Sequence, residues 1–175
     1  MNKVYIISPH YIRNASEIGN DVEDKYISRS ILSSQNIDIQ GILGTQLFEV
    51  VIDACHANAV SGTSLTTRMD NLIEDYLVPT LMYSVLRDVL PYIYFKITPK
   101  SVSTQDGQYS KPVEYDLLTL LKKDYDEKYQ HHIRRMINYI DNHADVYPEY
   151  GVTRTDGDPQ NMEPGSGNYF SGLEL

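Results

Sequence analysis

Cysteine, tryptophan and long apolar runs are scarce or missing in this chain. Its 175 residues include one cysteine, no tryptophan and three phenylalanines. A single cysteine cannot form an internal disulfide, and the apolar run VVIDAC around Cys55 favours a buried thiol over a nucleophile. No apolar run approaches the roughly 20 residues of a membrane span, so we expect no membrane contact. The start of the chain, MNKVYIISPHYIRN, has too short an apolar run for a secretory signal, which predicts assembly in the cytoplasm.

Basic residues are outnumbered by acidic ones. There are 15 Lys and Arg residues against 24 Asp and Glu, which gives a formal net charge of -9. Proteins that hold nucleic acid through phosphate contacts need clustered basic side chains. The two basic pairs, at 122–123 and 134–135, share a stretch with several acidic residues, which is typical of a solvated helix face. We therefore expect no specific binding of nucleic acid.

Tyrosine is the aromatic residue that the chain has in quantity, with 15 copies. Its ring supplies apolar area and its hydroxyl a polar tip, a combination that suits half-buried surfaces where partners meet. A compositional bias of the source organism would give the same excess. The sequence leaves both explanations open.

Catalytic and metal-binding patterns are not matched. Glu127 and His131 are four residues apart, with His132 beside them, but no third ligand follows at a suitable spacing. The stretch GILG lacks the spacing and the lysine of a phosphate-binding loop, and no GxSxG motif occurs. We expect His132 to be a satisfied, half-buried side chain. The sequence therefore predicts no enzymatic activity, no metal and no cofactor.

Apolar residues recur at helical spacing through most of the chain, which predicts an all-α fold. After an irregular N-terminal arm, 1–20, with a short strand at 4–8 that Pro9 ends, we expect helices at 21–36 (N-cap Asp21), 45–59, 69–97 and 112–147. Pro79 removes one backbone hydrogen bond from the third and most apolar of these helices, so a kink is expected near Asp75. The predicted architecture is a four-to-five-helix bundle with a kinked central helix.

The segment between the last two helices is polar. Residues 99–111 predict a protruding β-hairpin or long loop with its turn at Asp106-Gly107. The helix that follows should turn its apolar side chains inward. That predicted inner face consists of Leu117, Leu118, Leu121, Tyr125, Tyr129, His132, Ile133, Met136, Ile137 and Ile140.

Composition changes abruptly after Tyr150. Residues 151–175 hold five of the ten glycines and end in an apolar cluster that includes Tyr169, Phe170 and Leu173. Such a segment cannot bury enough apolar area to fold alone. It is either an unstructured tail or an extended arm that orders when it docks on a neighbouring subunit. We therefore divide the chain into an N-terminal arm (1–20), a helical domain (21–150) and a C-terminal arm (151–175).

Two glycines interrupt the apolar stretch QNIDIQGILGTQLF at 35–48. Glycine inside a helix costs about 1 kcal/mol relative to alanine, so Gly41 and Gly44 need a structural reason. We predict a helix end at residue 36 and then a buried corner, with Gly41 at a close approach and Gly44 as a tight exit before Thr45 caps the next helix. The residues that define this corner are Gln35, Ile39, Gly41, Leu43 and Gly44.

The order of these elements resembles the head-tail connector proteins of tailed phages, of the adaptor or head-completion type. The nearest resemblance is to versions in Bacteroidetes-infecting, crAss-like phages, and it covers roughly residues 15–150. The motifs that carry it are packing motifs. The positions that match best are Gln35, Ile39, Ile42, Leu43, Gly44, Leu47, Asp75, Tyr76, Tyr147, Pro148, Glu149 and Tyr150.

The resemblance implies a virion structural protein at the neck, the junction of head and tail. About twelve copies would form a closed ring that joins the portal to the tail and surrounds the DNA channel. Expected partners are further copies of the chain, the portal protein, and tail or further neck proteins, while DNA passes the acidic channel without specific binding. Expected contact residues are Asp106, Gly107, Tyr109, Tyr169, Phe170 and Leu173. The alternative is a small helical protein-binding or regulatory module that acts as a monomer or dimer.

Overall fold

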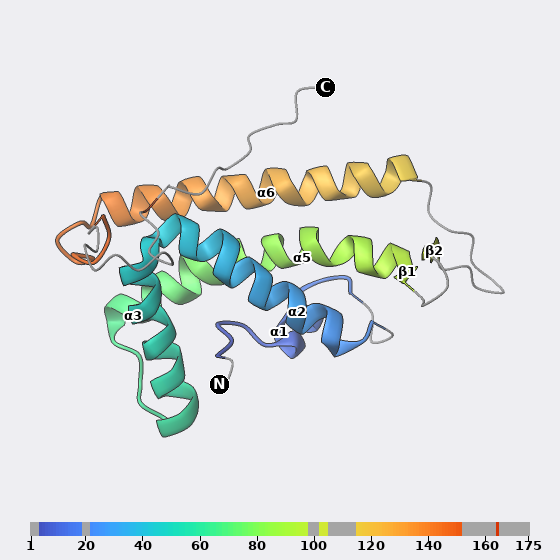
Figure 1. Cartoon of the computed structure of the whole chain (residues 1–175). Helices are drawn as coiled ribbons and strands as arrows, with labels where there is room; N and C mark the ends of the chain where they lie inside the picture. Colours follow the sequence, from blue (N-terminus) through green and yellow to red (C-terminus); the bar gives the residue numbers. More distant parts are fainter. Residues whose placement is uncertain (1–3, 19–21, 98–101, 105–114, 152–163, 165–175) are drawn as a thin grey trace, which may run out of the picture.

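The computed structural model of the chain is mostly helical, which confirms the all-α class (Figure 1). It describes residues 4–18, 22–97, 102–104, 115–151 and 164. No helix among these residues is both long and apolar enough to cross a membrane. The elements in chain order are α1 (Pro9–Ala15), α2 (Asp24–Ser34), η1 (Gln35–Ile39), α3 (Gln40–Ser61), α4 (Thr67–Leu72), η2 (Ile73–Leu77), α5 (Val78–Tyr94), β1 (Phe95–Ile97), β2 (Val102–Thr104) and α6 (Tyr115–Asp141); η1 and η2 are π-helical turns.

Helix α5 is the central helix, as its apolar sequence predicted. It packs against α6 along one side and against α2 along another (Figure 1). Because two helices cover α5, apolar side chains are needed on more than one of its faces. The core that results contains Leu81, Val85 and Val89 of α5, Ile27 and Ile31 of α2, and Tyr129, Ile133, Met136 and Ile140 of α6, all of them buried.

A π-helical turn, η2, lies where the sequence predicted a kink near Asp75, and it joins α4 to α5. Pro79 has no N–H to bond the carbonyl oxygen of Asp75, its partner in a regular helix. The guanidinium of Arg135 on α6 donates to that oxygen instead, at 3.2 Å. The interruption is therefore compensated by a neighbouring helix.

The prediction of a strand at 4–8 is wrong, because a glutamine side chain takes the place of a strand partner. Gln35 accepts a hydrogen bond from the backbone N–H of Ile6 at 3.0 Å and donates one to the carbonyl of Val4 at 3.1 Å. Pro9 begins helix α1 instead of ending a strand. Ser8 caps that helix, and a proline at the first helical position has its φ angle already set.

The chain does change direction within residues 35–48, as predicted, but the change occurs at a single residue. The predicted helix end at residue 36 is wrong, since the chain continues through η1 into α3. The break falls inside α3 at Gly44, whose φ of 74° and ψ of 160° are not helical. A Cβ atom on Gly44 would lie 2.8 Å from Cδ of Pro164, so the site also has no room for a side chain. Gly41 is buried within the helical part of α3.

Helix α2 begins at Asp24 with Glu23 as its N-cap residue, later than predicted, and Asp21 lies outside the described residues. Helix α5 ends at Tyr94, and the two short strands after it pair antiparallel, with Phe95 opposite Thr104. The predicted turn at 106–107 lies beyond β2 and outside the described residues. It is therefore not the connection between these two strands.

Helix α6 buries only part of its predicted inner face. Its buried side chains start at Tyr125, whereas Leu117 and Leu121 are exposed, so the inward placement of these two leucines is wrong. The first turns carry apolar residues at 117, 118, 120 and 121, which span almost half of the helix circumference. A single neighbouring helix cannot cover so wide a surface.

Candidate interaction surfaces

The structure brings together one of the two residue sets that the sequence singled out. The corner residues Gln35, Ile39, Gly41, Leu43 and Gly44 are all buried in one continuous stretch. The predicted contact residues Asp106, Gly107, Tyr109, Tyr169, Phe170 and Leu173 lie outside the described residues. The surfaces available for partners are therefore sought on the described helices.

A charged cluster ties three elements together inside the molecule. Arg87 of α5 contacts Asp38 of η1 at 3.0 Å, Asp126 of α6 at 3.0 Å and its neighbour Asp88 at 3.1 Å. The ring of Tyr129 lies 4.6 Å from the guanidinium carbon, so the cation also has an aromatic face beside it. The arrangement fixes η1 and α6 against the central helix.

Burial raises the pKa of Asp38, although hydrogen bonds from Ser84 and Arg87 oppose this effect. Burial also works against the charge on Arg87, but the carboxylates of Asp38 and Asp88 more than offset it and raise the pKa of Arg87. The positive charge of Arg87 and the negative charges of Asp38 and Asp88 thus stabilise one another. In the described part of the chain, no group of three or more His, Cys, Asp and Glu side chains could hold a metal ion.

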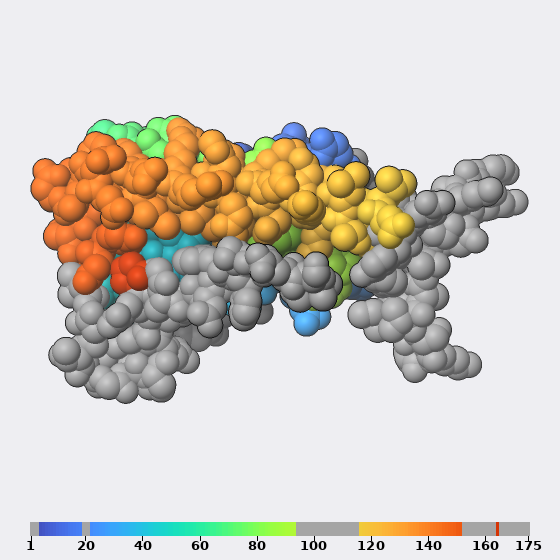
Figure 2. Space-filling view, turned by 90° about the horizontal axis from the view of Figure 1, so that it is seen from above, coloured from blue at the N-terminus to red at the C-terminus, as the bar shows by residue number. Residues whose placement is uncertain are grey.

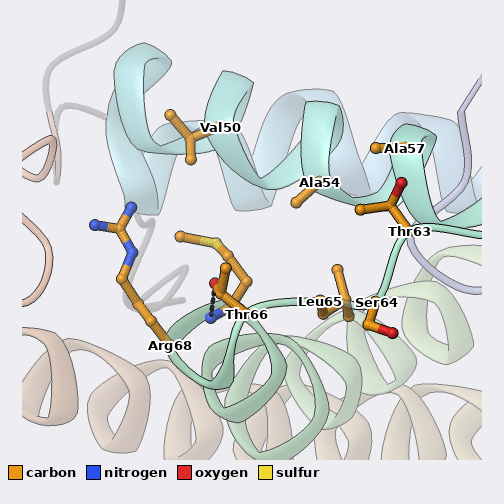
Figure 3. A pocket seen from close by; sticks show the side chains of 9 residues that line it. Val50, Ala54, Ala57, Thr63, Ser64, Leu65, Thr66 and Arg68 are labelled. Carbon is orange, nitrogen blue, oxygen red and sulfur yellow. Dashed lines mark hydrogen bonds between the residues drawn. The ribbon is translucent and has the colours of Figure 1, made fainter.

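The first candidate surface is a projecting arm, which we call the α3–α4 arm (residues 50–70). Figure 1 shows the second half of α3 and the loop after it extending away from the other helices. A groove of about 550 Å³ runs along this arm. Val50 and Ala54 lie on the side of α3 that faces the segment carrying Leu65, Thr66 and Arg68 (Figure 3). The full lining is Val50, Ala54, Ala57, Thr63, Ser64, Leu65, Thr66, Arg68 and Met69.

The tip and sides of the α3–α4 arm combine apolar and acidic groups. Val60, near the tip, is 70% exposed. Asp53 lies on the same side of α3 as Val50 and Ala57, and Asp70 lies in the first turn of α4; both carboxylates are exposed. The arm is therefore an apolar surface with a negative border.

The base of the α3–α4 arm is fixed by the turns that follow α6. Arg68 donates to the carboxylate of Glu149 and to the carbonyl oxygen of Val146, both at 2.8 Å. The hydroxyl of Tyr147 donates to the carbonyl of Arg68 at 2.9 Å, and the Tyr147 and Tyr139 hydroxyls are 3.2 Å apart. Several tyrosines thus have a structural role, in holding the arm.

The second candidate surface is the outer face of α2 with the N-terminal segment beside it, which we call the α2 face. A hollow of about 550 Å³ lies there. Ile37 is 67% exposed, and the cations Lys25 and Arg29 lie on the same side of α2. The α2 face therefore pairs exposed apolar area with positive charge. Its lining is Tyr5, Lys25, Ser28, Arg29, Leu32, Ser33, Asn36 and Ile37.

The third candidate surface is a leucine ridge at the start of α6, formed by Leu117, Leu120 and Leu121. These positions are spaced i, i+3 and i+4, so the three side chains share one helix face, and all three are exposed. In Figure 2 the start of α6, in yellow, lies at one end of the helix and the turns after α6 at the other. The leucine ridge therefore lies far along α6 from the base of the α3–α4 arm.

Sequence reasoning missed all three surfaces, although a signal for one of them was present. The leucines of α6 exceed the width of one buried helix face. The projection of the α3–α4 arm had no such signal, because it depends on the direction that the chain takes after Gly44.

Taken together, the chain is a mostly helical protein with a fixed interior and three uncovered surfaces among its described residues. A model of a family of unknown function, DUF6712, matches residues 39–159, and the chain belongs to this family. The matched segment contains the α3–α4 arm, the central helix and the leucine ridge. No curated protein and no solved structure matches the chain.

Proposed function

We propose that the protein is a structural subunit of the phage neck, a head-tail connector that forms a ring between portal and tail. The observation that carries the proposal is the presence of uncovered apolar side chains on three separate surfaces of one small helical body. A subunit of such a ring has a neighbouring copy on each side and a further protein above or below it. Three surfaces are what such a position requires.

The residues that carry the resemblance also support a structural role. Asp75 and Tyr76 lie in η2, next to α6. The ring of Tyr76 stacks on Tyr139 with centroids 4.1 Å apart, and Tyr139 contacts Tyr147 in turn. Glu149 holds Arg68 at the base of the α3–α4 arm. In this proposal the matching positions act by holding a contact surface in place.

The proposed subunit is a four-to-five-helix bundle with an interhelical hairpin and an extended C-terminal arm at 151–175. The hairpin residues Asp106, Gly107 and Tyr109 and the arm residues Tyr169, Phe170 and Leu173 would add contacts to neighbouring subunits. The net charge of -9, repeated around a ring, would give the channel a negative potential. DNA would then pass without binding, and the protein would act in the virion without catalysing a reaction.

The proposal is tested by mixing the full chain with the portal protein of the same phage. Native mass spectrometry and negative-stain imaging should find a ring of the chain seated on the portal. A chain that stays monomeric in isolation would still agree with the proposal, because a portal ring can drive assembly by mass action. A chain that never joins the portal ring would contradict it and favour a small binding or regulatory module instead.

A further inference from the structure

We infer that the α3–α4 arm of one copy docks on the α2 face of the next copy. The inference rests on the proposed function, since it names the two surfaces through which ring subunits would meet. Two different surfaces on each subunit make a head-to-tail contact, and such a contact closes into a ring when the rotation between copies permits. A contact between identical surfaces would stop at a dimer.

Shape supports this pairing. The α3–α4 arm projects from the body of the molecule (Figure 1). Val60, one residue before the end of α3, is exposed. The α2 face is hollow, with about 550 Å³ of space between α2 and the N-terminal segment. Apolar side chains occur on both, with Leu65 and Val60 on the arm and Leu32 and Ile37 on the face. A projecting apolar tip and an apolar hollow are complementary.

Charge supports the same pairing. Asp53 and Asp70 border the arm, and Lys25 and Arg29 border the α2 face. Lys25 also pairs with Glu23, at 2.6 Å, so Arg29 is the main cation of this face. Opposite charges around an apolar contact set its register and speed its formation.

The contact can be tested by disulfide cross-linking of the full chain, with Cys55 replaced by serine so that only engineered cysteines react. A Val60→Cys, Ile37→Cys chain should give a ladder of covalent oligomers on mild oxidation in the presence of the portal protein. Chains with one of the two cysteines should remain mostly monomeric alone and should form dimers when mixed. Leu120→Cys serves as the matched control, because Leu120 is similarly exposed, at 64%, but lies on the leucine ridge.

Charge reversal gives a second readout on the same chain. Asp53→Lys should lower the yield of cross-linked oligomers at least several-fold, and so should Arg29→Glu. Combining the two in one chain should restore most of the yield, because each contact regains an opposite pair. The cross-linking yield should also fall as salt concentration rises.

Two results would overturn the inference. One is a double-cysteine chain that joins the portal ring but gives no covalent oligomers on oxidation. The other is cross-linking of Val60→Cys to Leu120→Cys that is as efficient as cross-linking to Ile37→Cys. Either result would leave the connector proposal to be judged separately, because assembly with the portal does not depend on these cysteines. Failure of the connector proposal would appear in the portal experiment instead.

Discussion

Gly44 determines the path of the chain between η1 and the α3–α4 arm. Its φ of 74° and ψ of 160° fall in a region of backbone space that side chains exclude, and Pro164 fills the space that a Cβ atom would need. Both reasons that the sequence suggested for a glycine in this stretch, a turn and a close approach, apply at this one position.

We therefore expect Gly44→Val to lower the free energy of unfolding by about 1 to 3 kcal/mol, because valine must adopt a strained backbone. Chemical denaturation should show the loss as a lower midpoint. Gly62 provides the control, since its φ of 63° and ψ of 18° lie in the left-handed region that asparagine tolerates and nothing is near its Cβ position. Gly62→Asn should cost much less, and equal losses at the two sites would contradict this explanation.

The surroundings of His132 predict how the stability of the fold depends on pH. Its ring stacks on Tyr83 with centroids 5.3 Å apart, and its Nδ1 is buried without a hydrogen-bond partner among the described residues. The prediction of a satisfied histidine is wrong for this atom. Burial lowers the pKa of His132 from its usual 6.5, and His131 and Arg135 add to the effect.

Because the unfolded chain takes up this proton first, His132 should destabilise the fold as the pH falls below 6.5 and have no such effect above it. Urea denaturation between pH 6.5 and about pH 5 should show a steeper loss of stability for the wild type than for His132→Phe. Equal losses of stability in the wild type and in His132→Phe would show that His132 has the same pKa in the folded and the unfolded chain.

At the scale of elements, the charged cluster around Arg87 predicts how α5, η1 and α6 depend on one another. Arg87→Met would leave the half-buried carboxylate of Asp38 without its cation and near the acids Asp88 and Asp126. Asp38 would keep its hydrogen bond from Ser84, so we expect a loss of stability of about 1 to 3 kcal/mol near neutral pH, less than for a fully buried pair.

The loss in Arg87→Met should shrink in acid. Burial already raises the pKa of Asp38, and loss of the cation should raise it further, so the proton that neutralises the buried carboxylate is bound at higher pH. The stability that comes from the protonated form is present at low pH and is lost as the pH rises through the raised pKa. Urea midpoints at pH 7.5 and at about pH 5 measure this difference. A loss of stability in Arg87→Met that is the same at both pH values would contradict the role given to the Asp38 carboxylate.

The junction of α4 and α5 provides another prediction. Arg135→Gln should destabilise the chain by about 1 kcal/mol, because it removes a hydrogen bond to the carbonyl oxygen of Asp75. In a chain that also carries Pro79→Ala, the new N–H can supply that hydrogen bond, so the cost of Arg135→Gln should be smaller. A double-mutant cycle by chemical denaturation measures the coupling. Additive effects would show that the contribution of Arg135 does not depend on the missing N–H of Pro79.

The sequence predicted best those elements whose apolar residues recur at helical spacing and are also buried in the structure. The central helix, the interruption near Asp75 and the buried part of α6 follow from apolar spacing and from one proline. Helix α1 was missed because Ser8 and Pro9 start a helix too short to show a period. The helix end at 36 was placed wrongly, since π-helical turns absorb irregular spacing without stopping the chain.

At the scale of the whole molecule, the candidate surfaces could not be predicted because exposure depends on which elements meet. Val60, Ile37 and Leu120 are apolar residues, and their sequence neighbours do not determine whether another element covers them. The exposure of Val60 follows from the corner at Gly44, and that of Leu120 from its position before the buried part of α6, which starts at Tyr125. The charged borders of the arm and of the α2 face likewise emerge only when distant segments are placed side by side.

The central claim is that this chain is a ring-forming subunit of the phage neck. Its most direct test is mass spectrometry and imaging of purified virions of the phage that encodes the chain. We expect the chain in the virion, in about as many copies as the portal protein, and density for a ring of it between portal and tail. Virions that are complete and infectious but contain none of this chain would contradict the claim.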